Sequence, residues 1–310
     1  MKTLEDVIAE DLRQPAPEGL AGLLNALRER YGNQLRAVLV YGSCRRGVTV
    51  QEGLVDLLVL VESYRKVHDW FGPALLNHLL PPNVYFLQVD HAGKTVRCKY
   101  ALVTVEQFGR RCQSRSDHYF WARFTQPCRL LYVAESNGTA AALVQSRATA
   151  ARFFCRRIAP LVEGSTKATE FWETALATTY RCELRPEPPG NARRLIAADP
   201  AFWESLTAAL ANEPGNDLGA AADRYTGTSG PWRSRMSRLS WLARKATGKC
   251  FNLARLFKAA GTFSNGIDYI TWKVERHSGV RIEPTERMRR YPRLAAWGLA
   301  WRMWRQGGFR

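Results

Sequence analysis

This chain of 310 residues has neither long apolar runs nor paired cysteines, and each absence narrows the classes of protein to which it could belong. No apolar stretch approaches the roughly 20 residues that a membrane-spanning helix requires. The first 13 residues alternate acidic and apolar side chains and contain no signal-peptide core. The seven cysteines include no Cys-x-x-Cys pair and no His/Cys spacing typical of zinc. These absences favour a protein of the reducing cytosol, which would meet a membrane only at its surface.

Acidic residues are scarce in the last quarter of the chain. Residues 231–310 contain 18 lysines and arginines but only 4 aspartates and glutamates, so this segment holds nearly all of the net charge of +17. It also contains six of the ten tryptophans. Such a segment suits a phosphate-rich partner, either nucleic acid or an anionic membrane surface.

The spacing of apolar residues predicts an α/β sheet followed by helices. Helices are expected at 19–30 and near 68–79, and strands at 36–41, 54–61, 84–89 and 95–103. We therefore expect three segments: an α/β domain at 1–135, a mostly helical domain at 136–230, and a basic, Trp-rich, helical segment at 231–310. Residues 213–231 are rich in Gly, Asp and Pro, which indicates a loop.

A Gly-Ser pair ends the first predicted strand. Gly42 would let the backbone approach a phosphate closely, and Ser43 adds a hydroxyl donor, so both are candidate nucleotide-binding residues. A simple strand-ending turn is the alternative interpretation of this pair.

One charge interrupts the second predicted strand. Asp56 lies within the apolar run 54–61, where burying a carboxylate costs several kcal/mol unless a cation pairs with it. The strand order places Asp56 at the same end of the sheet as Gly42-Ser43. Carboxylates that hold Mg²⁺ under a triphosphate serve nucleotidyl transfer, so Asp56 is the candidate catalytic residue and metal ligand. An aspartate at a strand edge, forming a helix cap or a salt bridge, is the alternative.

The predicted site contains few acidic residues. Together, the turn and Asp56 outline a polymerase-β-type nucleotidyltransferase site, whose usual pattern is Asp-x-Asp, but the second position here is Leu58. Asp90 is the first candidate for a further metal ligand and Glu62 the second, although Asp90 could simply cap a turn. A phosphate monoester is already ionised at neutral pH, so a phosphate acceptor needs no strong base. The few carboxylates therefore favour an acceptor that attacks through a phosphate oxygen.

In their order, these motifs resemble the mitochondrial-type phosphatidate cytidylyltransferase family, also called the translocator assembly and maintenance family, which has bacterial relatives. The resemblance covers about 35–135 well and 165–185 loosely. It is carried by Tyr41-Gly42-Ser43, Val55-Asp56-Leu57, Val84-Tyr85-Phe86, Lys99-Tyr100 with Val103, Arg123 with Pro127, Tyr180 with Glu183 and Arg185, and the stretch 262–269. Two departures are Cys44-Arg45-Arg46-Gly47, where the family has a small Gly-rich turn, and Ala101, where it has Gly.

The resemblance implies a polymerase-β-like nucleotidyltransferase domain, a second helical or winged-helix domain, and a C-terminal segment that contacts the membrane. It implies that CTP and phosphatidate react to give CDP-diacylglycerol and pyrophosphate, with Mg²⁺ as cofactor and Lys99 on a CTP phosphate. The implied location is cytoplasmic and peripheral on the inner membrane. Lys99 as a solvated strand residue is the alternative.

The end of the chain carries an aromatic stripe. Trp297, Trp301 and Trp304 recur at helical spacing with Arg302 beside them, which predicts a helix lying among anionic headgroups. A helix packed on the core and a nucleic-acid-binding tail are the alternatives. Asn265 and Asp268 are further, weaker candidates for the active site.

Three functions therefore stand side by side. The first is a peripheral-membrane cytidylyltransferase acting on phosphatidate, for which nucleic acid is the less favoured partner. The second is a nucleotidyltransferase acting on RNA or on a small soluble acceptor. The third is a non-catalytic binding protein, in which Leu58 reflects the loss of metal chemistry.

Overall fold

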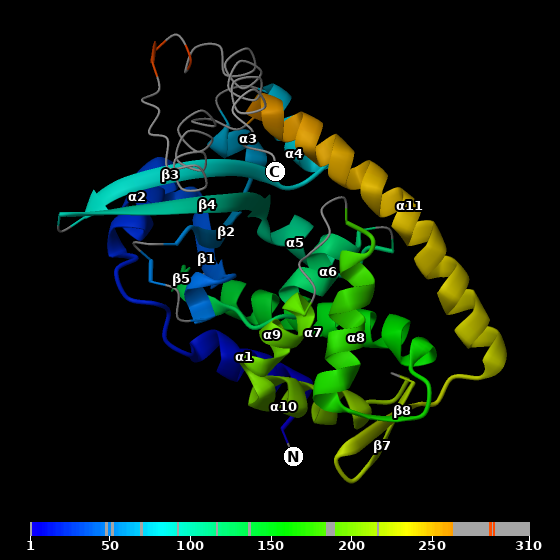
Figure 1. Cartoon of the computed structure of the whole chain (residues 1–310). Coiled ribbons are helices and arrows are strands. Elements are labelled where there is room, and N and C mark those ends of the chain that lie inside the picture. The colour runs from blue at the N-terminus through cyan, green and yellow to red at the C-terminus, as the bar shows by residue number, and fades with distance from the viewer. Residues whose placement is uncertain are drawn as a thin grey trace, which may run out of the picture.

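The computed structural model in Figure 1 is an α/β structure, as the sequence predicts. It describes residues 2–46, 49–50, 53–68, 71–91, 93–115, 117–135, 138–183, 190–215, 217–262, 285–286 and 288.

A mixed sheet of five strands forms the centre of the protein, in the order β3-β4-β2-β1-β5. The parallel pair is β2–β4, and the other neighbours are antiparallel. The strands are β1 (Leu35–Tyr41), β2 (Val55–Val61), β3 (Asn83–His91), β4 (Lys94–Thr104) and β5 (Arg129–Val133). The four strands predicted from apolar runs are thus confirmed within a few residues, and β5 is added at the edge.

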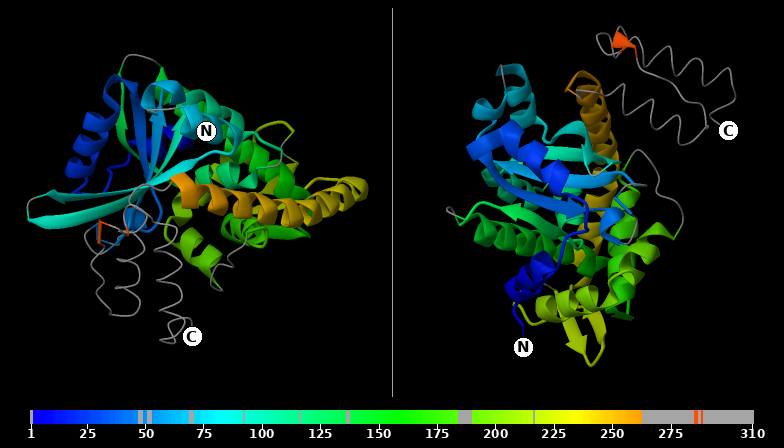
Figure 2. Two further views of the ribbon diagram at one scale, coloured as in Figure 1. Left: turned by 90° about the horizontal axis from the view of Figure 1, so that it is seen from above. Right: turned by 90° about the vertical axis from the view of Figure 1, so that its left-hand side faces the viewer.

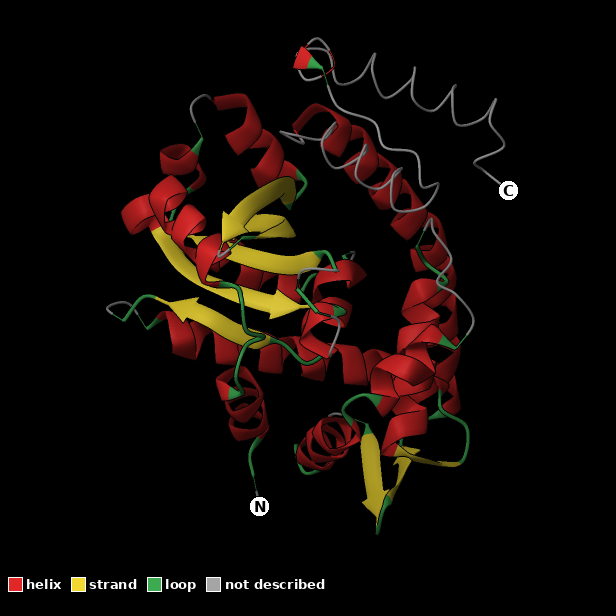
Figure 3. Ribbon diagram, turned by 60° about the vertical axis from the view of Figure 1, so that its left-hand side comes forward, coloured by secondary structure: helices red, strands yellow, loops and turns green. Residues whose placement is uncertain are grey.

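Both faces of this sheet are buried, and alternation along each strand divides the side chains between two cores. Val38 and Val40 point into a core shared with helix α2 (Ala21–Tyr31), whereas Ala37 and Leu39 point into the opposite core. Figure 3 shows helices on both sides of the yellow strands. Because both faces are covered there, β1 and β2 are nearly continuous apolar runs, and Asp56 is the one acidic residue within β2.

The helices form most of the rest of the chain. They are α1 (Leu4–Arg13), α2 (Ala21–Tyr31), α3 (Tyr64–Val67), α4 (Phe71–Leu79), α5 (Val105–Cys112), α6 (His118–Phe124), α7 (Thr139–Ile158), α8 (Ala168–Tyr180), α9 (Asn191–Ala197), α10 (Pro200–Ala211) and α11 (Pro231–Thr262), with short 3₁₀ turns at Gly32–Gln34 (η1), Cys44–Arg46 (η2) and Ala159–Leu161 (η3). Helix α1 begins with a capping box between Thr3 and Asp6 and packs against α7 and α10.

A second, small sheet corrects one prediction. Strands β6 (Ser165–Lys167), β7 (Leu218–Ala221) and β8 (Arg224–Gly227) pair in the order β6-β8-β7. The prediction of a loop over 213–231 was therefore wrong, because two four-residue strands lie within it. Strands this short contain too few apolar positions to show alternation among Gly and Asp residues.

One core crosses the predicted segment boundaries. The apolar cluster on the Asp56 side of the sheet includes Leu39 from β1, Phe154 from α7, Trp203 from α10 and Trp241 from α11. Residues from all three predicted segments thus contribute to a single buried cluster. Figure 2 shows α11 running along the outside of the helices that cover this side.

Two sequence-based expectations bear on the cellular environment. In the part of the chain that the structure describes, no helix is both long and apolar enough to cross a bilayer. The seven cysteines, all within the described ranges, form no disulfide, and six of them are buried.

Candidate nucleotide site

The Gly-Ser turn lies directly against Asp56. Strand pairing sets Tyr41 opposite Asp56, and Gly42 follows with a φ of +81°. A Cβ atom on Gly42 would lie 2.5 Å from an Asp56 carboxylate oxygen. Position 42 therefore requires glycine twice, once for its backbone conformation and once for the close approach.

Lys99 provides the cation nearest to this carboxylate. In the parallel pair β2–β4, Lys99 is the partner of Asp56, and its Nζ lies 3.2 Å from Asp56 Oδ1. Both side chains keep some exposure, 39% for Lys99 and 22% for Asp56, so solvent still screens the pair. A metal ion that binds Asp56 would compete with the Lys99 ammonium for the carboxylate. A substrate phosphate at the same place would lie close to the ammonium.

A cavity of about 270 Å³ opens over this group. One wall is the end of β1 and the start of β2, and the others come from α6, α8, α9 and α10. Its volume is near the lower end for small-molecule sites. The lining residues are Tyr41, Gly42, Ser43, Arg45, Asp56, Arg123, Gln126, Pro127, Tyr180, Asn191, Leu195 and Trp203.

Arg123 adds a second positive charge to the cavity wall. Its guanidinium carbon lies 5.7 Å from the ring centre of Tyr41 and 5.6 Å from that of Tyr119. Burial alone would lower the pKa of Arg123, but the neighbouring Tyr119, Tyr41, Glu183 and Asp56 outweigh burial and raise it. The guanidinium therefore stays charged beside the carboxylate. The cavity places one carboxylate beside Arg123 and near Lys99, a composition that suits a phosphorylated ligand.

Arg45 stands where the resembled family has a small Gly-rich turn, and its side chain is paired with another residue of this chain. Its guanidinium forms a two-pronged pair with Asp199, just before α10, and its side chain is only 4% exposed. This pair fastens the η2 turn to the helices on the far side of the cavity. Arg45 is therefore part of the wall rather than a free charge for a triphosphate.

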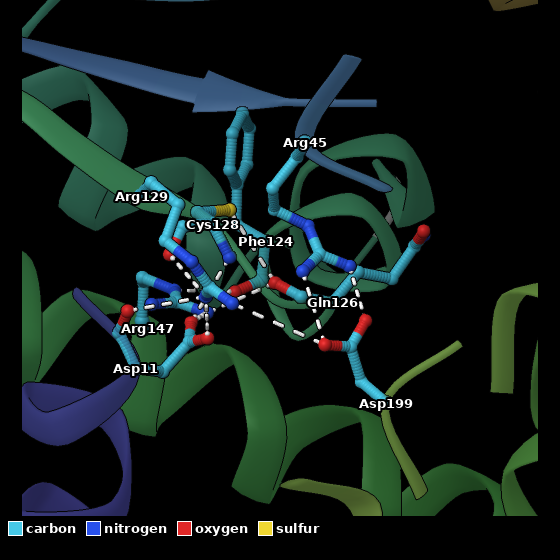
Figure 4. Close-up of polar contacts among 8 residues, drawn as sticks. All are labelled: Asp11, Arg45, Phe124, Gln126, Cys128, Arg129, Arg147 and Asp199. Carbon is cyan, nitrogen blue, oxygen red and sulfur yellow. Dashed lines mark hydrogen bonds and ion pairs between the residues drawn. The ribbon is translucent and has the colours of Figure 1, made fainter. Parts of the chain in front are cut away.

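Behind this pair lies a buried ionic cluster, drawn in Figure 4. Asp11 accepts from Arg129 at 2.5 Å and from Arg147 at 2.8 Å. Arg147 also donates to the carbonyl oxygens of Phe124 and Gln126 at 3.0 and 2.9 Å. These bonds fix the segment after α6, which carries the cavity residues Gln126 and Pro127.

The other acidic candidates lie away from Asp56. Asp90 is exposed and accepts a 2.6 Å hydrogen bond from Thr95, its partner in the β3–β4 hairpin. Thr95 lies four residues along β4 from Lys99, which places the two residues roughly 13 Å apart at the usual rise per residue. Glu62 follows the opposite end of β2 and pairs with Arg36 at 2.7 Å. The prediction that Asp90 shares a metal site with Asp56 is therefore corrected, because the hairpin carries Asp90 away.

Leu58 occupies the position at which an Asp-x-Asp pattern would have its second aspartate. Leu58 lies on the same face as Asp56 and is fully buried in the core beneath the cavity. Among the described residues, no group of three or more His, Cys, Asp and Glu side chains is arranged to hold a metal. Asp56 is the one carboxylate among the residues that line this cavity, so Mg²⁺ would find one carboxylate ligand there and would depend on phosphate oxygens or other neutral oxygens for the rest.

Several predicted residues lie outside the described part of the chain. They are Asn265, Asp268, Trp297, Trp301, Arg302 and Trp304. Of the predicted nucleotide-binding residues, the structure brings Gly42, Ser43 and Lys99 together around Asp56.

Sequence reasoning missed the residues that α9 and α10 contribute. Asn191, Leu195 and Trp203 line the cavity, and Asp199 holds Arg45, which is 154 residues away in the chain. No local pattern marks such long-range contacts. The arrangement can bind an anion beside a carboxylate. A scan against models of protein families and a search of curated proteins each give no match for this chain.

Proposed function

We propose that this protein is a cytidylyltransferase that converts CTP and phosphatidate to CDP-diacylglycerol and pyrophosphate at a membrane surface. The five-stranded sheet would be a polymerase-β-like nucleotidyltransferase domain, and the helices with the small sheet a winged-helix domain. One observation carries the proposal. Tyr41-Gly42-Ser43, Asp56, Arg123 with Pro127, and Tyr180 come from four separate segments, each with a motif of the resemblance, and they line one cavity.

Nucleotidyl transfer requires groups that position phosphates and neutralise their charge, and this cavity contains such groups. A phosphate oxygen of the acceptor attacks the α-phosphorus of the nucleotide, the bond to the bridging oxygen breaks, and pyrophosphate leaves with the electron pair. Because the acceptor is already ionised, the protein has to position both substrates and neutralise charge. Ser43 can donate to a phosphate oxygen, and Lys99 and Arg123 can offset its charge.

The cofactor implied by the resemblance fits this site in a limited way. Asp56 would hold Mg²⁺, and nucleotide phosphates and water would complete its coordination. Bound there, the ion would neutralise the charge that develops on the transferred phosphate. Lys99 now pairs with Asp56 and would turn toward the phosphates once the carboxylate has another cation.

Release of pyrophosphate from CTP, measured with and without phosphatidate in vesicles, tests the proposal. We expect release to require both phosphatidate and Mg²⁺. Asp56→Asn should lower turnover about 100-fold or more, because charge neutralisation at the reacting phosphate is lost. Asp90→Asn is the matched control and should retain turnover, since Asp90 is exposed and bonded to Thr95.

The remaining outcomes separate the alternatives. Release that depends on RNA but not on phosphatidate would replace this proposal with an RNA acceptor. Nucleotide binding with no release under any condition would favour a binding protein. Full turnover by Asp56→Asn would show that the cavity is not the active site.

A further inference from the structure

Helix α11 carries only positive charges, and most of its arginines have acidic partners. Residues 231–262 include eight lysines and arginines and no aspartate or glutamate. Arg233, Arg238 and Arg255 each form an ion pair with an acidic side chain elsewhere in the protein. Arg244 is half-buried, and no acidic side chain of the described ranges pairs with it. Its charge therefore lacks compensation from this part of the chain.

Two further arginines lie beside Arg244. Arg157 is in the last turn of α7, and Arg115 is in the segment between α5 and α6. Arg244 donates a 3.1 Å hydrogen bond to the carbonyl oxygen of Arg115, and the charges of both residues act on Arg157. Among the described side chains, no carboxylate forms an ion pair with Arg115 or Arg157. We call these three residues the arginine cluster.

The surroundings of Arg157 make its charge costly. Burial, together with the positive charges of Arg244 and Arg115, lowers the pKa of Arg157 to about 9. The last carbonyl groups of a helix attract a cation, but the Arg157 carbonyl already accepts hydrogen bonds from Trp241 at 3.1 Å and from Ser237 at 3.0 Å. The described part of the chain therefore gathers three like charges and supplies no anion to balance them.

Aromatic rings fix the planes of two of these guanidinium groups. The guanidinium carbon of Arg157 lies 3.2 Å from the ring centre of Phe153, and that of Arg244 lies 5.5 Å from the ring centre of Trp241. A stacked guanidinium keeps its N–H groups at the edge of its plane, where they can donate to oxygen. The Nε atoms of Arg157 and Arg244 are both buried and have no acceptor among the described groups. Both arginines thus have donor capacity that the described protein leaves unused.

We infer that the arginine cluster binds a small soluble phosphate anion, either inorganic phosphate or the terminal phosphate of a small ester. Such a group carries close to two negative charges at neutral pH and has several acceptor oxygens, so one anion can bridge three guanidinium groups. The cluster lies where α11 meets the end of α7, and the anion would join these two helices. The residues that line the nucleotide cavity include none of the three arginines, so this site is separate from it.

The inference needs no catalytic step, so it can fail or succeed independently of the proposed function. The test is calorimetric titration and thermal unfolding of the full chain with inorganic phosphate, at constant ionic strength and without CTP or Mg²⁺. We expect phosphate to bind and to raise Tm, whereas acetate at the same ionic strength should do neither. Lys99→Gln alters the nucleotide cavity and should leave this binding in place.

Single variants examine the cluster itself. Arg115→Gln and Arg244→Gln should each weaken phosphate binding about tenfold to 100-fold, because each removes a charged donor. Arg115 is exposed, so its variant tests the site without disturbing the core. Arg235→Gln removes an exposed arginine from the same helix and should bind phosphate as the wild type does.

Stability without phosphate distinguishes a binding site from a structural one. Arg244→Gln should then unfold at an unchanged or higher temperature, because a positive charge near Arg157 is removed. An arginine that only supports the packing of α11 would give a lower temperature instead. A second titration with glycerol phosphate identifies the source of the phosphate: equal affinity indicates a small ester, and binding of inorganic phosphate alone indicates the free ion.

Three results would overturn the inference. The first is wild-type protein that binds no phosphate. The second is binding that is lost in Lys99→Gln but kept in both cluster variants, which would place the anion in the nucleotide cavity. The third is equal weakening in Arg115→Gln, Arg244→Gln and Arg235→Gln, which would indicate a general attraction to a basic surface instead of a site.

Discussion

The Cβ atom of any residue other than glycine at position 42 would lie only 2.5 Å from a carboxylate oxygen of Asp56. The carboxylate and the turn therefore form one unit, in which a side chain at position 42 would displace Asp56. The predictions below use this unit, the cation beside it, and the ionic contacts behind it.

Gly42→Ala should abolish most nucleotide binding. The substitution both strains a φ of +81° and displaces Asp56, so we expect a loss of at least ~1–3 kcal/mol in stability as well. Gly164→Ala is the matched control, because Gly164 has a φ of +70° and no atom within 4 Å of its Cβ position. Thermal unfolding and CTP titration of both variants separate strain from contact. Equal CTP affinity in the two variants would mean that Asp56 plays no part in binding.

Lys99→Gln should raise the KM for CTP about tenfold to 100-fold, because a charged hydrogen bond to phosphate contributes about 1.5–3 kcal/mol. Lys94→Gln, on the same strand but exposed at the hairpin, should leave the KM unchanged. Steady-state kinetics at varied CTP provide the measurement. An unchanged KM in Lys99→Gln would reduce Lys99 to a solvated partner of Asp56.

Asp199→Asn should destabilise the protein by roughly 3 kcal/mol, because it leaves the buried Arg45 guanidinium without its opposite charge. Glu163→Gln removes an acidic partner from an exposed pair with Arg238 and should change stability by less than about 0.5 kcal/mol. Urea unfolding of the two variants makes the comparison. Similar effects would show that the Arg45–Asp199 pair does not fasten the cavity wall.

Lys258 makes stability depend on pH. Its ammonium is buried against the carbonyls of Leu80 and Pro82, and burial, with Arg255 and Arg111 nearby, lowers its pKa to about 7. In the unfolded chain this lysine keeps its proton up to its usual pKa near ~10, so between these values the unfolded state binds more protons. Unfolding free energy should therefore rise with pH above neutrality, by about 1.4 kcal/mol per pH unit at most.

Urea unfolding of wild type and Lys258→Met at about pH 7 and about pH 9 isolates this contribution, since other groups titrate equally in both proteins. The variant should show the smaller increase. Parallel pH dependences would mean that burial does not lower the pKa of Lys258 in the folded protein.

The sequence predicted those parts of the protein that depend on local pattern. The strands around Gly42 and Asp56 were recognisable because each is an apolar run, and a charge inside one is costly. Strands β7 and β8 were missed because they are short. Helix α1 was missed because its acidic and apolar residues indicate an alternation, although the side chains that it buries recur at helical spacing. Asp90 was misplaced because hairpin length, not strand order, sets its distance from Asp56.

The contacts between distant segments could not be predicted. Arg45 and Asp199 pair across 154 residues, and Asp11 reaches two arginines from β5 and α7. Such pairs leave no periodicity, because each partner is a single charged residue in an ordinary context. The cavity wall built by α9 and α10 was hidden for the same reason.

The position of Trp241 has a mechanical consequence. Its indole belongs to the same buried cluster as Tyr41 and Trp203, which line the cavity. A helix anchored in this way cannot swing like a tether. A change in the position of α11 would therefore require repacking of the buried cluster that supports one wall of the cavity.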